Sequence, residues 1–187
     1  ERTQLKLDAC EPFLFASEIA LRQMDDAGHV SIDEILCDPA LAEEFDRLAK
    51  KFAPGYSSFE YRWGALRLRK EARVARNRAW ALKPVQFPRP RPLKKIDWLD
   101  ISSGAGVYSV STRKGKEALF VGEATNLREQ LKARFSSKSR KSWQPFADEL
   151  ELATFPASLS FTDLLGYRTQ AVQKMKPRLN LLNLASE

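Results

Sequence analysis

The chain has 187 residues and a net charge of +7, enough length for one medium domain or two small ones with buried cores. No run approaches the eighteen apolar residues of a membrane span, and two cysteines outside a CxxC pattern with a single histidine argue against a structural zinc site. We therefore expect a soluble protein of the cytoplasm, a reducing compartment, with no membrane partner.

The positive charge is concentrated in the middle of the chain. Residues 1–53 carry 6 basic and 12 acidic side chains, residues 54–96 carry 12 and 2, and residues 97–187 carry 13 and 10. The net charge of +10 in the middle block is typical of proteins that bind a polyanion, usually nucleic acid. The alternative is a solvated basic helix that packs against the acidic N-terminal block.

The first 82 residues are expected to form a helical domain. Ser31 precedes Glu34 by three residues, which is the spacing of a capping box at a helix start, and "SSFE" repeats it. Asp38 followed by Pro39 predicts the start of a further helix, whose apolar residues recur at intervals of three and four.

The segment 59–80 is the most basic part of the chain and is predicted to be one helix. Phe59 and Trp63 lie on one face of this helix, whereas four arginines recur along another: Arg62, Arg69, Arg73 and Arg76. The planar guanidinium fork matches phosphate oxygens, so we interpret this row as nucleic-acid contacts. A solvated face is the alternative interpretation.

Four prolines interrupt the helical pattern in the next segment, 83–96. This density of proline cannot continue a helix and favours an extended, semi-rigid connector. We interpret the segment as a linker between the helical domain and a second domain at 97–187. A ligand for an SH3-type domain is the alternative.

The second domain shows a mixed α and β pattern, so the predicted fold class is α+β with a three-stranded, mainly antiparallel sheet flanked by helices. A turn at Gly115 joins the first two strands into a hairpin. The expected elements are strands at 107–111 and 118–121, a helix after Asn126, a strand at 149–155, a helix from 160 that ends at Pro177, and a closing strand or extended segment.

Four pieces of this domain occur in an order found in one enzyme family: Gly106-Val107-Tyr108, Phe120-Val121-Gly122, the helix "EATNLREQLKARF" and the closing "QKMKPRLNLL". Together they span about residues 104–184 and resemble the GIY-YIG nuclease superfamily. The resemblance implies a small sheet whose strands present tyrosines to a shared groove. It also implies phosphodiester hydrolysis assisted by a divalent metal, Mg²⁺ or Mn²⁺.

The family's functional positions are altered in this chain. The resemblance places the water-activating tyrosine at Tyr108, but the second aromatic is Phe120, the phosphate-binding arginine is replaced by Gln130, and the metal-binding glutamate is replaced by Arg168. A cation 4 Å from a divalent ion is repelled by roughly 8 kcal/mol at an effective dielectric of about 20, and it would attract a phosphate instead. We therefore expect the fold without the reaction, and no cofactor.

A working endonuclease with a rearranged site is the first alternative. Arg128 or Arg134 would then replace the missing helix arginine, Tyr108 would be catalytic, and Mg²⁺ or Mn²⁺ would be required. The carboxylate would come from Glu149, Glu151 or Asp163. Exposed strand positions explain the two glutamates without catalysis, and helix capping explains the aspartate.

Basic side chains of the second domain predict retained binding, with DNA the favoured partner. Arg128 and Lys132 are four residues apart on one helix, and the loop "SSKSRKSW" adds cations beside an aromatic ring that could stack on a base. The complete set of expected nucleic-acid contacts is Arg62, Arg69, Arg73, Arg76, Arg128, Lys132, Arg134, Lys138, Arg140, Lys141 and Arg168. A protein-protein interaction module, whose charged blocks bind a protein partner, is the second alternative.

Overall fold

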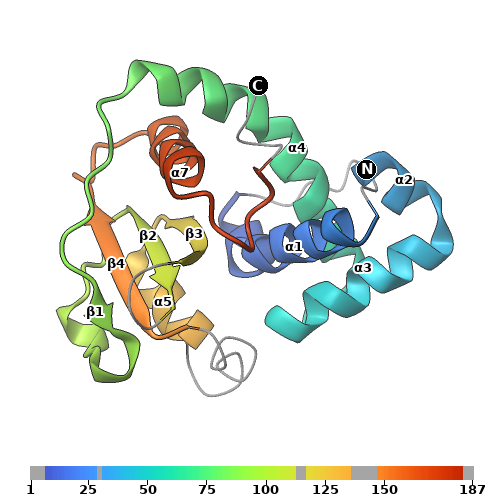
Figure 1. The fold of residues 1–187 in the computed structure, drawn as a ribbon, viewed down its shortest axis with the longest axis horizontal. Coiled ribbons are helices and arrows are strands. Elements are labelled where there is room, and N and C mark those ends of the chain that lie inside the picture. Colours follow the sequence, from blue (N-terminus) through green and yellow to red (C-terminus); the bar gives the residue numbers. More distant parts are fainter. Residues whose placement is uncertain (1–6, 29–30, 113–116, 136–146, 183–187) are drawn as a thin grey trace. The chain divides into compact units, whose positions relative to one another are not determined.

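The computed structural model describes residues 7–28, 31–112, 117–135 and 147–182 (Figure 1). The protein is α+β, with a helical N-terminal region followed by an antiparallel sheet and its helices, which confirms the predicted fold class. Two compact units, Glu1–Lys70 and Glu71–Glu187, divide the chain within one helix, and each is described by itself. None of the described helices combines the length and apolar character needed to cross a membrane.

In its described residues, the first unit consists of helices joined by short turns and contains no strand. Ser31 and Glu34 form the predicted capping box, and the Asp38 carboxylate caps the next helix by accepting from the amides of Ala40 and Leu41. The elements are α1 (Leu7–Gly28), α2 (Ile32–Cys37), α3 (Pro39–Phe52) and the first half of α4 (Ser58–Ala81).

In the core of this unit, α1 and α4 pack closely against each other. The hydroxyl of Ser17 on α1 donates to the carbonyl of Tyr61 on α4 at 2.9 Å. Gly64 lies beside Ser17, whose Oγ would be 2.7 Å from a Cβ at that position. The Tyr61 side chain is buried, and its hydroxyl donates to the carbonyl of Ala53. Small residues and internally satisfied hydroxyls therefore let the two helices pack closely.

The proline-rich segment belongs to the second unit, although the sequence predicted a linker there. Its residues 91 and 92 form strand β1 (Arg91–Pro92), which pairs with a sheet strand, and Val85 is buried in the core with its amide donating to Gln170 Oε1 at 3.2 Å. Proline is tolerated on an edge strand because its missing N–H faces away from the ladder. The compact units therefore divide earlier, within α4.

The sheet of the second unit has the strand order β1-β4-β2-β3, and all pairs are antiparallel. The three longer strands match the predicted ones: β2 (Gly106–Ser111), β3 (Ala118–Ala124) and β4 (Glu149–Thr154). Tyr108 pairs with Gly122, and Val110 pairs with Phe120, so these side chains share one face. The predicted turn at Gly115 lies outside the described residues.

Two helices cover opposite faces of this sheet (Figure 1). The core beneath α7 (Phe161–Met175) contains Val107 and Val121, which lie on the sheet face opposite to the one that carries Tyr108. The other helix, α5 (Leu127–Phe135), meets that tyrosine face. As predicted, Ser160 caps the start of α7, and its hydroxyl accepts from the Asp163 amide.

The segment after α7, described up to residue 182, runs along the outer edge of β3, and its described residues form no regular strand. The amides of Arg178 and Leu179 donate to the carbonyls of Ala118 and Leu119 at 3.0 and 2.8 Å. The buried side-chain amide of Asn180 then pairs with both backbone groups of Val121. This segment satisfies an edge that would otherwise expose unpaired backbone groups.

Candidate nucleic-acid interface

Tyr108 and Arg134 form a buried polar contact between β2 and α5. Tyr108 is fully buried and Arg134 is 5% exposed. The Arg134 guanidinium donates to the Tyr108 hydroxyl, and its central carbon lies 5.2 Å from the centre of the tyrosine ring. The Phe120 ring lies beside the same tyrosine at 6.2 Å. Arg134, a predicted nucleic-acid contact, therefore lies in the buried interface between α5 and the sheet rather than on the protein surface.

The glycines of the two signature tripeptides are explained by packing. A Cβ on Gly122 would overlap the Tyr108 hydroxyl and ring, with Cε1 only 2.6 Å away. A Cβ on Gly106 would overlap Leu127 and come within 2.5 Å of the Ala153 carbonyl oxygen. Both positions therefore require glycine for close approach, whether or not the domain is catalytic.

The position assigned to the family's metal-binding glutamate holds an ion pair. Arg168 Nε on α7 lies 3.0 Å from Glu123 Oε2 on β3, and the two side chains are 12% and 10% exposed. Gln130, at the position assigned to the helix arginine, is half-buried on α5. In the part of the chain that the structure describes, no group of three metal-binding side chains occurs.

The alternative carboxylates lie apart from Tyr108 in the sheet pattern. Glu149 and Glu151 alternate with the strand residues that share the tyrosine face. Burial, and secondarily the charge of Glu149, raises the pKa of Glu151. Asp163 forms an ion pair with Arg78, and hydrogen bonds from Arg78 first and Ser160 second hold its pKa below the usual range.

The arginine row of α4 is divided between the two units. Arg62 forms a two-point ion pair with Asp46, at 2.6 and 3.2 Å, and Arg69 pairs with Asp33. These contacts correspond to the alternative in which the basic helix packs against the acidic block. Beyond the unit boundary, Arg73 is exposed, whereas Arg76 is half-buried and contacts its neighbours.

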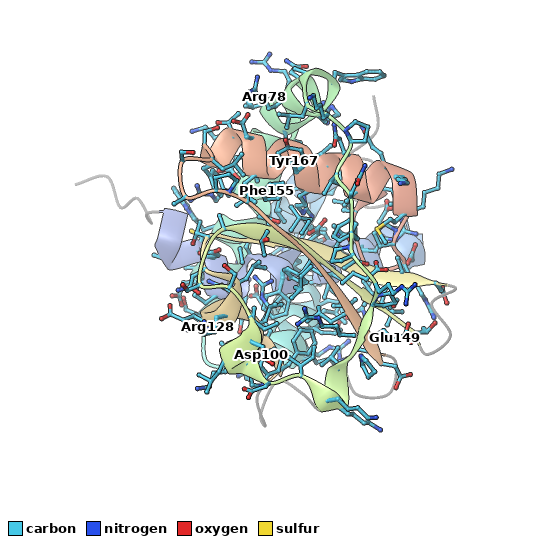
Figure 2. All side chains as sticks on the ribbon, turned by 90° about the vertical axis from the view of Figure 1, so that its left-hand side faces the viewer. Arg78, Asp100, Arg128, Glu149, Phe155 and Tyr167 are labelled. Carbon is cyan, nitrogen blue, oxygen red and sulfur yellow. The ribbon has the colours of Figure 1, made fainter. Side chains whose placement is uncertain are left out.

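The remaining predicted contacts differ in what they can offer a ligand. Arg128 donates to the carbonyls of Ile101 and Leu99 at 2.8 and 3.1 Å, which ties α5 to the short 3-10 helix η2 (Trp98–Asp100) (Figure 2). Lys132 is exposed on α5. The predicted basic loop with Lys138, Arg140 and Lys141 lies outside the described residues.

Among the described residues of the second unit, the most basic exposed segment is residues 83–95, which we call the basic strap. Its charge was counted in the middle block of the sequence, but none of its cations was predicted to be a contact. It holds five exposed cations and no carboxylate: Lys83, Arg89, Arg91, Lys94 and Lys95. Its backbone is anchored by Val85, by β1, and by the Leu93 amide, which donates to the Asp148 carbonyl at 2.8 Å. The absence of any acidic residue among its prolines was the available signal.

No family model, curated protein or solved structure matches this chain. The likeness to the GIY-YIG nucleases therefore depends on the four motif pieces and their order.

Proposed function

We propose that this protein binds nucleic acid, with DNA the favoured partner, and that it does so on a degenerate GIY-YIG-like domain without cleaving the strand. The protein acts in the cytoplasm under this proposal. The basic strap forms the principal phosphate-binding surface, together with Arg73 and Lys132.

The observation that carries this proposal is the exposure of all five cations of the basic strap. Phosphate contacts require accessible lysine and arginine side chains, and a segment without carboxylates presents them with little internal neutralisation. Because hydrogen bonds to Gln170 of α7 and to Asp148 beside β4 fix its backbone, the strap loses less conformational freedom on binding than a free tail would lose.

Two contacts support binding in place of cleavage. Arg168 stands where the family has its metal-binding glutamate. It forms an internal ion pair with Glu123. Tyr108 is fully buried against Arg134, whereas a tyrosine that activates water must meet the substrate. The family positions thus contribute to the structure of the domain.

The test compares two double variants that each remove two positive charges. Lys94→Gln/Lys95→Gln alters the strap, and Lys50→Gln/Lys70→Gln alters two exposed lysines of the first unit. Binding to a labelled duplex is measured from 50 to 200 mM salt. We expect the strap variant to weaken binding and to reduce the slope of log affinity against log salt by about 0.9 per lost phosphate contact. The control should keep the wild-type slope.

Equal slopes for the two variants would contradict the proposed surface, and an affinity independent of salt would contradict phosphate binding altogether. The same samples are incubated with Mg²⁺ or Mn²⁺ and, separately, with EDTA. Metal-dependent cleavage that Tyr108→Phe abolishes would favour the endonuclease alternative. The absence of binding to any nucleic acid would favour the protein-interaction module.

A further inference from the structure

Two cavities lie side by side in the second unit and share a wall formed by Pro84 and Val85. The first cavity, of about 430 Å³, is lined by Trp80 and Lys174 among others. The second cavity, of about 350 Å³, is lined by Tyr167 and by Lys83, the first residue of the basic strap. Each cavity therefore combines an aromatic ring with a lysine.

The first cavity has a strongly exposed aromatic ring at its rim. Trp80 lies in the last turn of α4 and is 75% exposed, which is unusual for the largest apolar side chain. The buried side of this cavity is held in place by Gln170, whose amide donates to the carbonyls of Ala79 and Leu82 at 2.7 and 2.9 Å. An accessible indole and a wall held by hydrogen bonds therefore line the same cavity, a combination that suits a planar ligand.

The second cavity contains an aromatic pair. The rings of Phe155 and Tyr167 stack with their centres 4.4 Å apart and their planes 17° apart (Figure 2). Lys83 and Gln86 lie on the strap side of the cavity and are exposed. A planar ligand group in this cavity, next to one in the first cavity, would thus contact the ring of Tyr167, the ammonium group of Lys83 and the amide of Gln86.

We propose that the two cavities receive two neighbouring unpaired bases of a single-stranded nucleic acid. The inference rests on the proposed function, because the strap supplies the phosphate contacts that continue from Lys83. Base stacking on aromatic side chains is tolerant of sequence, and lysines beside the rings can neutralise the phosphates between the bases. The residues that line the cavities include two lysines and no carboxylate, so their charge suits an anionic strand.

A duplex cannot satisfy this site in the same way. Its bases are stacked on one another inside the helix, and extracting one requires its pairing and stacking to be broken. A single strand offers free base faces and can follow the shared wall from one cavity to the other. The site therefore predicts a preference for single strands that phosphate contacts alone do not explain.

The test uses two single-stranded DNA probes of identical charge, a twelve-nucleotide oligothymidine and the same oligomer with abasic sugars at every position, together with a twelve-base-pair duplex. Trp80→Ala removes the exposed ring, and Trp80→Phe restores an aromatic side chain. Leu99→Ala is the matched control because Leu99 is also 75% exposed in the same unit but lines neither cavity.

We expect Trp80→Ala to weaken binding of oligothymidine about tenfold or more, with partial recovery in Trp80→Phe. Binding of the duplex and of the abasic oligomer should be unchanged, and Leu99→Ala should resemble the wild type. Equal affinity of the wild type for oligothymidine and for its abasic form would overturn the inference, as would an unchanged affinity in Trp80→Ala.

The strap variant Lys94→Gln/Lys95→Gln separates this inference from the proposed function. If this variant weakens binding of every probe while Trp80→Ala changes none, the base cavities are refuted and the phosphate-binding surface stands. If the wild type binds no probe at all, the proposed function fails and the inference fails with it.

Discussion

Arg134 donates to the hydroxyl of Tyr108 across the interface between α5 and β2, and both side chains are removed from solvent. The contact is charge-assisted, and the guanidinium also lies near the tyrosine ring. Loss of one partner from such a contact leaves a buried charge with fewer hydrogen bonds, which costs more than the bond contributes on its own.

The hydroxyl of Tyr108 is therefore expected to stabilise the fold. Tyr108→Phe should lower the free energy of unfolding by about 1–3 kcal/mol, measured by urea denaturation, because Arg134 loses a buried acceptor. Tyr167→Phe is the control, since the hydroxyl of Tyr167 makes no hydrogen bond within the described ranges. A Tyr108→Phe variant as stable as the wild type would contradict the structural role of this hydroxyl.

Gly122 is expected to tolerate no side chain while Tyr108 is present. Gly122→Ala would place a Cβ against the tyrosine hydroxyl and ring, and overpacking of this kind costs about 1–3 kcal/mol or more. Thermal unfolding is compared with that of Gly104→Ala, whose nearest neighbour is the rotatable hydroxyl of Ser102 at 3.2 Å. Equal midpoints for the two variants would show that the sheet relaxes around position 122.

Substitutions in the ion pair between Arg168 and Glu123 distinguish a structural role of Arg168 from a phosphate-binding role. Arg168→Met should destabilise the protein by about 3 kcal/mol or more, because it removes the cation beside a nearly buried carboxylate. The double variant Arg168→Met/Glu123→Gln should be less destabilised than the sum of the two single variants. Additive losses of stability, with weakened nucleic-acid binding in Arg168→Met alone, would instead support a phosphate contact.

Local signals predicted the secondary structure well. The capping box at Ser31, the N-cap at Asp38 and the alternation in β2 each depend on residues close in sequence, so the pattern alone defines them. The α+β class follows from the same signals. The unit boundary was harder to predict, because it falls inside the continuous helix α4 where no proline or glycine marks it.

The candidate site depended on long-range partners that sequence spacing does not reveal. Arg134 was predicted to face a nucleic acid, yet its partner Tyr108 is 26 residues away in the chain. Arg168 on α7 was likewise predicted to bind phosphate, and its partner Glu123 lies 45 residues earlier in the chain, on strand β3. The segment of the basic strap was interpreted as a linker because prolines are uncommon in paired strands, yet β1 pairs with β4.

Glu151 is expected to make the stability depend on pH. Its pKa is raised in the folded state, so the folded protein binds more protons than the unfolded chain, and this contribution to stability is lost as pH rises through the raised pKa. Glu151→Gln should therefore raise the unfolding midpoint at pH 7. The difference should vanish below the ordinary pKa of about 4.5. Glu117→Gln, at an exposed position, is the control, and a Glu151→Gln effect of the same size at both pH values would refute the assignment.

Asn180 is expected to protect the outer edge of the sheet. Its side-chain amide accepts from the Val121 backbone amide at 2.8 Å and donates to the Val121 carbonyl at 2.9 Å. The Asn180 side chain is fully buried. Asn180→Ala should destabilise the protein by about 1–3 kcal/mol, because both backbone groups lose a partner that water cannot easily replace. Asn180→Asp should cost more, since it keeps the acceptor but sets a buried carboxylate against the carbonyl of Val121.

Hydrogen exchange gives this prediction a local measurement. The Val121 amide should exchange faster in Asn180→Ala than in the wild type, whereas amides of α3 should keep their rates. Asn77→Ala, at an exposed position of α4, removes the same side chain from a solvated site and should leave both the stability and the Val121 rate unchanged. An unaltered Val121 rate in Asn180→Ala would mean that the edge is protected by the Arg178 and Leu179 backbone contacts alone, because these are the neighbouring hydrogen bonds along β3.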